Sequence, residues 1–227
     1  MSDAEHPAGS PITSEVRIGV FAEAPLPGRC SSKLLAAHAP EWATGLYASM
    51  LRDTLDGLLS IDAREYVVFG PDDDEGSAAL ARHVPAPWQI ARGIETVAGA
   101  VTRLEADRAI AILARSDAPS AAIDPLAQVL ASVGTGAFAV LGPADHGDAW
   151  LVGIARAAAL IGRDLPWTGP EVAATMRVRC TRAGIELHEL PPATIVDEPS
   201  AVLTLLEELR RHPERAPRTA HYVVSRG

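Results

Sequence analysis

The segment VRIGVFAEAPLPGR (residues 16–29) is a short β-branched run that passes directly into a loop rich in proline and glycine. A short apolar run bounded by turn residues predicts a buried strand. The same pattern recurs in EYVVFG (65–70), RAIAILA (108–114) and AFAVLG (137–142), and a polar turn follows each run. Stretches with apolar residues at helical spacing separate these strands, so the chain is predicted to alternate β and α elements.

Helices are predicted over residues 41–59, 77–82, 93–104, 123–130, 169–182 and 200–211. Further strands are predicted for AWLVGIA (149–155) and IELHEL (185–190), and HYVV (221–224) is expected to add an edge strand that could support a homodimer. This alternation predicts an α/β fold: one three-layer, Rossmann-like domain with a mostly parallel sheet. Residues 1–14 are expected to be a flexible leader, residues 15–211 the domain, and residues 212–227 a polar, Arg-rich tail.

The composition excludes several classes of protein. The chain has 227 residues, 48% of them apolar and 22% charged, which excludes a disordered or collagenous chain. Its net charge of -9 disfavours nucleic-acid binding. The sequence contains no apolar run of the roughly 18 residues that a membrane span needs, and no signal-peptide pattern. The two cysteines do not form a disulfide framework, so a soluble cytoplasmic protein is expected, without nucleic-acid or membrane partners.

Ligands of open α/β sheets bind at the carboxyl ends of the strands. The first loop there offers Gly28 in a turn, followed by Arg29, Ser31, Ser32 and Lys33 before a helix. Backbone amides, hydroxyls and cations in this order could hold a phosphate. The alternative is a Pro-rich connector in which Ser31 or Ser32 caps the helix.

Four further turns carry acidic residues. The turn after residue 142 holds Asp145, His146 and Asp148, which could bind a divalent metal or act as acid and base, or could simply form the turn. Asp117 follows the strand RAIAILA and could bind a metal or cap the next helix. Asp197 precedes the last predicted helix and could cap it. The acidic run PDDDEG (71–76) is expected to be a solvated turn.

Taken in order, these segments resemble a bacterial GT-A-like glycosyltransferase family of the nucleotide-diphospho-sugar transferase superfamily, some of whose members occur in arsenosugar-type biosynthetic clusters. FAEAPLPGRCSSKL is similar to the family's FxKxPxPGxxKTRL, RSDAPS to GSDxP, GPADHGDAWLVGI to GPxxDGGYxLxG, and IVDEPSAVLTL to DVDTxxDL. The stretch WTGPEVAATMRVRCTRAGIELHEL resembles a further family segment that begins with tryptophan. The resemblance extends from about residue 16 to residue 209.

The resemblance implies a GT-A domain that transfers a sugar from a nucleotide-sugar donor to a small-molecule acceptor. It implies that Gly28, Arg29, Ser31, Ser32 and Lys33 contact the nucleotide. It also implies that Asp117 and Asp197 hold Mg²⁺ or Mn²⁺, which would stabilise the diphosphate leaving group. On the same grounds His146 or Asp148 is expected to act as the base for the acceptor.

The sequence departs from the family pattern where charge matters. The first family lysine is Glu23 here, KTR is Ser31-Ser32-Lys33, the usual glycine before Ser116 is Arg115, and the family aspartate of DGGY is His146. The first loop is therefore less positive than a diphosphate site of this family. Two alternatives follow: a nucleotidyltransferase on the same fold, or a catalytically degenerate paralogue that binds a ligand or a partner protein.

Overall fold

The computed structural model describes residues 15–105, 109–134, 136–155 and 158–226. The predicted flexible leader, residues 1–14, lies outside the described residues. Within the described ranges no helix is long and apolar enough to cross a lipid bilayer.

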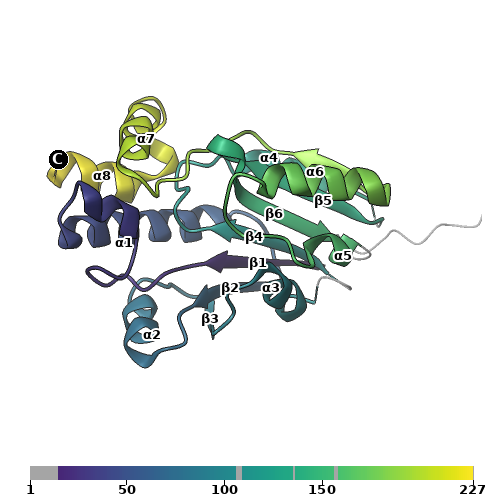
Figure 1. The fold of residues 1–227 in the computed structure, drawn as a ribbon, viewed down its shortest axis with the longest axis horizontal. Helices are drawn as coiled ribbons and strands as arrows, with labels where there is room; N and C mark the ends of the chain where they lie inside the picture. The colour runs from purple at the N-terminus through teal and green to yellow at the C-terminus, as the bar shows by residue number, and fades with distance from the viewer. Residues whose placement is uncertain (1–14, 106–108, 135, 156–157, 227) are drawn as a thin grey trace, which may run out of the picture.

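The described strands form one seven-stranded sheet in the order β3-β2-β1-β4-β6-β5-β7 (Figure 1). The strands are β1 (Val16–Phe21), β2 (Glu65–Gly70), β3 (Gln89–Arg92), β4 (Ile110–Arg115), β5 (Phe138–Pro143), β6 (Ala149–Ala155) and β7 (Glu186–Glu189). Only β6 of these seven strands is antiparallel to its neighbours, β4 and β5. The carboxyl ends of β1, β2, β4 and β5 therefore meet at one edge, where β6 begins.

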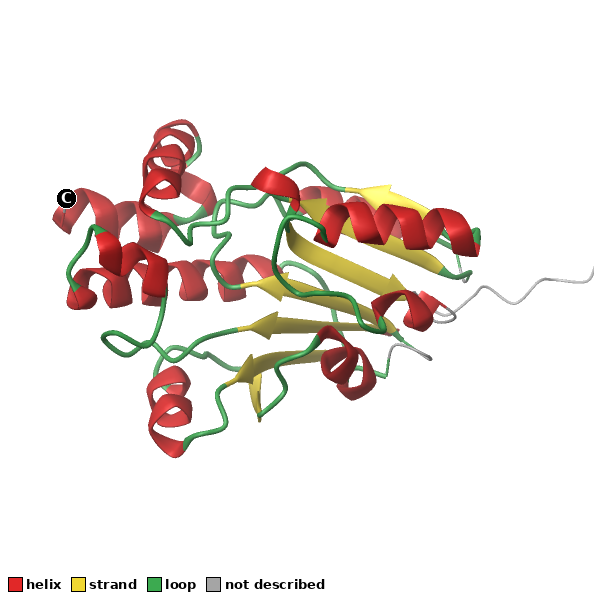
Figure 2. Ribbon diagram, viewed as in Figure 1, coloured by secondary structure: helices red, strands yellow, loops and turns green. Residues whose placement is uncertain are grey.

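Helices cover both faces of the sheet, as Figure 2 shows by colour. They are α1 (Pro40–Leu58), α2 (Asp74–Ala81), α3 (Val97–Arg103), α4 (Asp124–Ser132), α5 (Ala159–Gly162), α6 (Val172–Ala183), α7 (Pro199–Arg211) and α8 (Pro217–Arg226). The apolar residues of α1, α4, α7 and α8 pack on one face, and those of α3 and α6 pack on the other. The predicted three-layer α/β fold with a mostly parallel sheet is confirmed.

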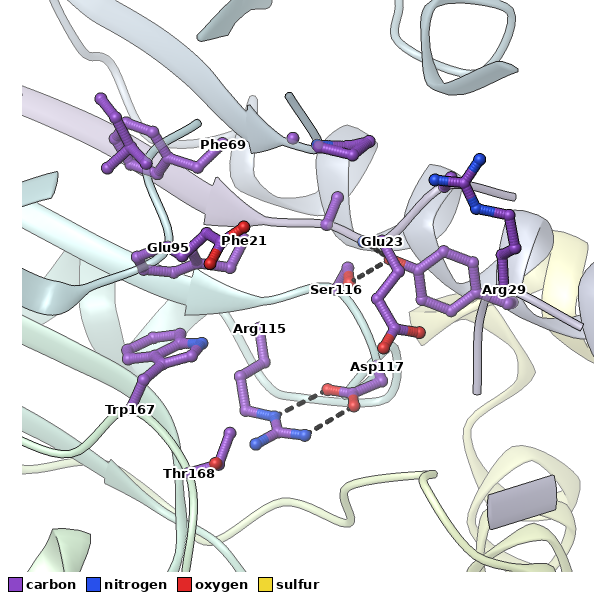
Figure 3. Close-up of a pocket in the computed structure, with 16 residues that line it drawn as sticks. Phe21, Glu23, Arg29, Phe69, Glu95, Arg115, Ser116, Asp117, Trp167 and Thr168 are labelled. Atoms are coloured by element: carbon purple, nitrogen blue, oxygen red, sulfur yellow. Dashed lines mark hydrogen bonds and ion pairs between the residues drawn. The ribbon is translucent and has the colours of Figure 1, made fainter. Parts of the chain in front are cut away.

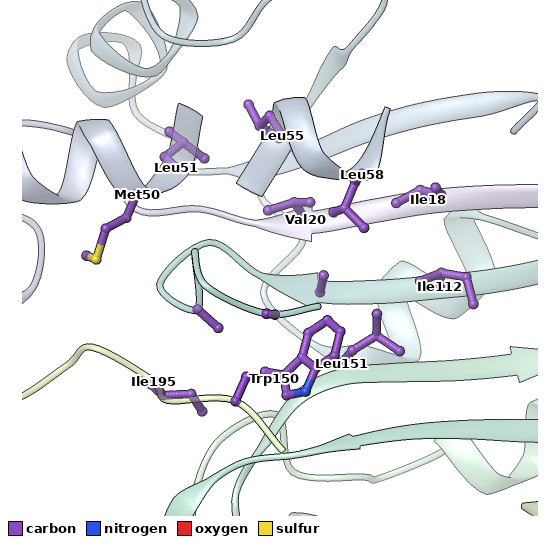
Figure 4. Packing of buried hydrophobic residues seen from close by; sticks show 14 of the residues in the cluster. Ile18, Val20, Met50, Leu51, Leu55, Leu58, Ile112, Trp150, Leu151 and Ile195 are labelled. Atoms are coloured by element: carbon purple, nitrogen blue, oxygen red, sulfur yellow. The ribbon is translucent and has the colours of Figure 1, made fainter. Parts of the chain in front are cut away.

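The central strands are buried on both faces, which explains their uninterrupted apolar sequences. Every residue of β4 and β6 is buried. On one side Ile18 and Ile112 contact the cluster that includes Leu51 and Leu55 of α1 (Figure 4). Because each sheet face is covered by helices, the apolar runs identify the strands without any alternation of polar residues.

Three segments differ from the secondary-structure predictions, and one of them is the short helix α5, which was not predicted. The strand β3 was not predicted, because its four residues have exposed or half-buried side chains and lack an apolar run. The predicted edge strand in HYVV is wrong: these residues belong to α8, which packs against α1. Asp53 of α1 accepts hydrogen bonds from the amides of Arg218 and Thr219 at the start of α8 and so stabilises a helix there. The sheet-edge contact on which the expected homodimer rested is thereby lost.

Candidate functional site

The site is centred on Arg115, the last residue of β4. Its Nε and Nη2 donate to the two carboxylate oxygens of Asp117, at 2.8 Å and 2.7 Å, and its Nη1 donates to Oδ2 of Asp148 at 3.2 Å. The guanidinium thus joins the turn after β4 to the turn between β5 and β6. Figure 3 shows the paired contact with Asp117.

The three side chains of this cluster are largely shielded from water. The Arg115 side chain is 10% exposed, and those of Asp117 and Asp148 are 17% exposed. Burial disfavours the charged guanidinium, but the hydrogen bonds to Asp117 and the charges of Asp117, Asp148 and Asp197 outweigh it, so the pKa of Arg115 is raised. Arg115 is therefore a permanent cation in this site.

A first pocket of about 460 Å³ opens beside this cluster at the carboxyl ends of β1, β2 and β4. Its apolar wall contains Phe21, Phe69 and Trp167 (Figure 3), with the ring centre of Phe21 4.6 Å from that of Trp167. Arg115 and Asp117 line the polar wall. An aromatic wall in the same pocket as a cationic group suits a ligand with both a planar ring and an anionic part.

A hydrogen-bonded chain fixes the loop after β1 against the turn after β4. The hydroxyl of Tyr47, buried in α1, accepts from the amide of Glu23 at 2.6 Å and lies 2.8 Å from Oγ of Ser116. The Glu23 carboxylate accepts from the amide of Ser31 at 2.7 Å. Partial desolvation raises the pKa of Glu23, and the nearby Asp117 raises it further, although the Ser31 amide and Arg115 act in the opposite direction. Glu23 therefore stabilises this loop but adds negative charge to the first pocket.

A second pocket of about 380 Å³ lies on the other side, between the β5–β6 turn and α7. His146 and Asp148 line it together with Lys33 and Asp197. His146 is exposed and has a left-handed backbone with φ 61°. Gly147 also has a positive φ, and a Cβ there would be 2.2 Å from the carbonyl oxygen of Pro170, so the turn requires glycine.

The residues predicted to bind a nucleotide do not form a single phosphate loop. Arg29 lines the first pocket, where its guanidinium pairs with Asp73 at 2.6 Å. Lys33 lines the second pocket, where its ammonium group pairs with Asp197 at 2.5 Å. Gly28 is exposed and has the left-handed φ of 78° that the turn requires. Both predicted cations thus already face a carboxylate.

The capping alternatives are not observed. Ser31 occupies the cap position of the short 3-10 helix Ser32–Ala36 but makes no side-chain capping bond. The cap position of α4 belongs to Ile123 rather than Asp117, and that of α7 to Glu198 rather than Asp197. In contrast, Asp73 of the acidic PDDDEG run caps α2 by accepting from the amide of Gly76, so this run is more than a solvated turn.

The expected divalent metal does not fit the carboxylates as they stand. Both oxygens of Asp117 accept hydrogen bonds from Arg115. One oxygen of Asp148 accepts from Arg115 and the other from the amide of Ala149, while Asp197 pairs with Lys33. Among the described residues no group of three or more His, Cys, Asp or Glu side chains is arranged to hold a metal ion. A metal ion at Asp117 would lie next to a buried guanidinium of the same sign of charge.

The structure adds residues that the residue patterns did not single out. Phe21 is the last residue of β1 and Phe69 the second-last of β2, and in the sequence both indicate only hydrophobicity. Tyr47 is one buried position of the helix α1. Trp167 did have a signal, because it begins the WTGPEV segment of the resemblance, but its contact with Phe21 depends on the tertiary fold. Ile195, which replaces the first aspartate of the resembled DVD motif, is 9% exposed and packs in the core.

Several solved structures share this architecture. The chain superimposes on a proposed nucleotide-diphospho-sugar transferase from Desulfovibrio desulfuricans G20 with a TM-score of 0.81 and 21% identity, over 93% of this chain and 95% of the other. It also resembles a CMP:2-keto-3-deoxy-manno-octonic acid synthetase complexed with CTP, with a TM-score of 0.52 and 15% identity, over 88% and 100% of the chains. A third similar structure is the manganese complex of Rv0371c from Mycobacterium tuberculosis H37Rv, with a TM-score of 0.53 and 14% identity, over 86% and 99% of the chains.

No protein-family model matches the chain, and no curated protein sequence matches it. Since the structural neighbours are less than 25% identical, the likeness establishes the fold. The chain has the fold of nucleotide-diphospho-sugar transferases and of nucleotidyltransferases, two classes that the architecture alone does not separate.

Proposed function

We propose that this protein is a nucleotide-sugar-dependent glycosyltransferase that places the donor nucleotide in the first pocket and a small-molecule acceptor in the second. One observation carries the proposal: two pockets adjoin at the carboxyl edge of the sheet, and the Arg115–Asp148 pair joins their walls. A transferase needs two substrates side by side, with the leaving group near a cation.

The reaction would replace one bond at the anomeric carbon. The acceptor oxygen or nitrogen bonds to that carbon, the bond to the diphosphate breaks, and the nucleoside diphosphate leaves. A base takes the acceptor proton. His146 and Asp148 are the two residues expected to act as this base. Both carboxylate oxygens of Asp148 already accept hydrogen bonds. His146 is exposed in the second pocket, so we assign the base to His146 and the orientation of Arg115 to Asp148.

The second candidate function is nucleotidyl transfer. The fold that this chain shares with the CTP-bound synthetase supports it. The products separate the two reactions, because sugar transfer releases a nucleoside diphosphate (or CMP from a CMP-sugar) and nucleotidyl transfer releases pyrophosphate. Calorimetry should first identify a ligand among UDP-, GDP-, CMP- and dTDP-sugars and the nucleoside triphosphates. Turnover with a sugar nucleotide and acceptor mixtures should then release the nucleoside diphosphate, or CMP where the donor is a CMP-sugar. Pyrophosphate release from a triphosphate and a sugar phosphate would support the second candidate instead, and binding without any turnover would support a degenerate paralogue.

Substitution of Trp167 tests whether the first pocket holds a nucleobase. Trp167→Ala should weaken nucleotide binding by about tenfold, because stacking of a base on an aromatic side chain contributes ~1–3 kcal/mol. Trp167→Phe is the matched control and should retain most of the affinity. Isothermal titration calorimetry with the nucleotide found in the panel measures both variants. Equal affinity of Trp167→Ala and the wild type would place the base elsewhere.

Glu23→Gln should strengthen binding of an anionic ligand about fivefold at neutral pH, because it removes one negative charge from the first pocket while an amide oxygen can still accept from Ser31. Protonation of Glu23 removes the same charge. Since its pKa is raised, wild-type affinity should increase as the pH falls toward that pKa, and the variant should lack this component. Titrations across pH provide the test, with Glu207→Gln on the exposed face of α7 as control. An unchanged affinity would show that the ligand's charge lies far from Glu23.

A further inference from the structure

The carboxylate after β4 already has a cation bound to it. Arg115 is the last residue of β4, a strand whose residues are all buried, so its backbone is held rigidly at the edge of the sheet. From there its side chain contacts both oxygens of Asp117 and one oxygen of Asp148. Paired N–H bonds to a carboxylate fix a guanidinium in orientation as well as position.

The geometry points to a guanidinium that replaces the divalent metal. We propose that Arg115 is the resident cation of this site, and that the protein binds the phosphate groups of its ligand without a metal ion. The part of the proposal that excludes a metal ion from this site depends only on the contacts of Arg115. The part in which Arg115 contacts the ligand's phosphate rests on the proposed function.

The unused donors of Arg115 supply the contact with an anion. A guanidinium carries five N–H bonds, and the carboxylates of Asp117 and Asp148 take three of them. One N–H on Nη1 and one on Nη2 have no partner in the described part of the chain, and Arg115 lines the first pocket. Guanidinium N–H groups are suited to donate to the oxygens of a phosphate group.

The surrounding charges explain why one cation suffices to exclude another. Asp117 and Asp148 carry two negative charges between them, and Arg115 offsets one. A divalent ion would have to displace the guanidinium from its carboxylates or bind beside it against charge repulsion. Removal of the guanidinium should therefore convert these carboxylates into ligands for a hard divalent cation, which prefers carboxylate oxygens.

Manganese binding tests the exclusion without any nucleotide. Electron paramagnetic resonance of added Mn²⁺ should show no specific site in the wild-type protein at protein concentrations near 0.1 mM, roughly the range of weak carboxylate sites. Arg115→Gly should bind Mn²⁺ at least about tenfold more tightly than the wild type, while Arg92→Gly, which removes an arginine paired with Asp74 outside both pockets, should not. A wild-type Mn²⁺ site that Asp117→Asn abolishes would overturn the proposal. The comparison of Mn²⁺ binding by the wild type and Asp117→Asn still tests the exclusion of metal if Arg115→Gly fails to give a cooperative thermal unfolding transition.

A second experiment measures binding of the nucleotide ligand found by calorimetry. Its affinity for the wild type should agree within about twofold in EDTA and in Mn²⁺, and Arg115→Gly should bind it only when Mn²⁺ is present. Wild-type binding that requires Mn²⁺ would contradict the proposal. If no nucleotide binds at all, the proposed function fails, whereas the Mn²⁺ titration of the wild type and Arg115→Gly continues to test the resident cation.

Discussion

Trp150→Ala should lower the free energy of unfolding by about 3–5 kcal/mol, which is the range for removal of a buried tryptophan or phenylalanine side chain. Trp150 is 2% exposed, and its indole lies against Gly142 of β5, where a Cβ would be 2.5 Å from the ring. The indole Nε1 donates to the carbonyl oxygen of Pro191 at 3.2 Å. The substitution would leave a cavity in the apolar cluster to which Trp150 belongs (Figure 4).

Denaturant unfolding at equilibrium measures this loss. Trp150→Phe is the control, since it keeps an aromatic ring on Gly142 but loses the bond to Pro191, and it should cost clearly less than the alanine variant. A loss below about 1 kcal/mol for Trp150→Ala would contradict the burial of Trp150, because such a small value is typical of exposed positions.

Asp53→Ala should cost about 3 kcal/mol and release α8 from α1, because hydrogen bonds to a charged group contribute ~1.5–3 kcal/mol each. The Asp53 side chain is 1% exposed, and its two oxygens accept from the amides of Arg218 and Thr219 at 3.2 Å and 2.7 Å. A negative charge there also favours the N-terminus of α8. Alanine would leave the buried amide of Thr219 and the partly buried amide of Arg218 without an acceptor.

Hydrogen exchange of residues 217–226 shows whether α8 detaches. Protection of these amides should be lost in Asp53→Ala before the sheet unfolds, while Asp53→Asn, which retains one acceptor oxygen, should be intermediate. Arg218→Ala is a further control: its side chain is 47% exposed, so loss of its ion pairs should have a small effect. Retained protection in Asp53→Ala would mean that apolar contacts alone hold α8.

The strands were predictable because a sheet covered on both faces needs uninterrupted apolar segments. All seven residues of β6 are buried, and AWLVGIA is correspondingly apolar. The predictions fail for segments that are not covered by helices on both faces of the sheet. The strand β3 at the sheet edge has exposed or half-buried side chains, and HYVV becomes helical because Asp53, more than 160 residues away, binds the amides at the start of α8.

The position of the site was also predictable, since the polar turns after β1, β4 and β5 had to meet at one edge. The contacts that the residues of the site make with one another were not predictable. Asp117 and Asp148 are 31 positions apart, and no local pattern indicates that one guanidinium joins them. Likewise Arg29 and Lys33, four positions apart, line different pockets.

The sequence by itself determined the α/β fold, the order of most strands and helices, and the edge at which polar residues gather, because hydrophobic periodicity and strand-end turns are local properties. Only the tertiary structure decided which charges pair: Arg115 with Asp117 and Asp148, and Lys33 with Asp197. The physical reason is that an ion pair depends on distance and burial, which parallel strands set between segments far apart in the chain. At this edge that pairing places a guanidinium against the carboxylate expected to bind a metal.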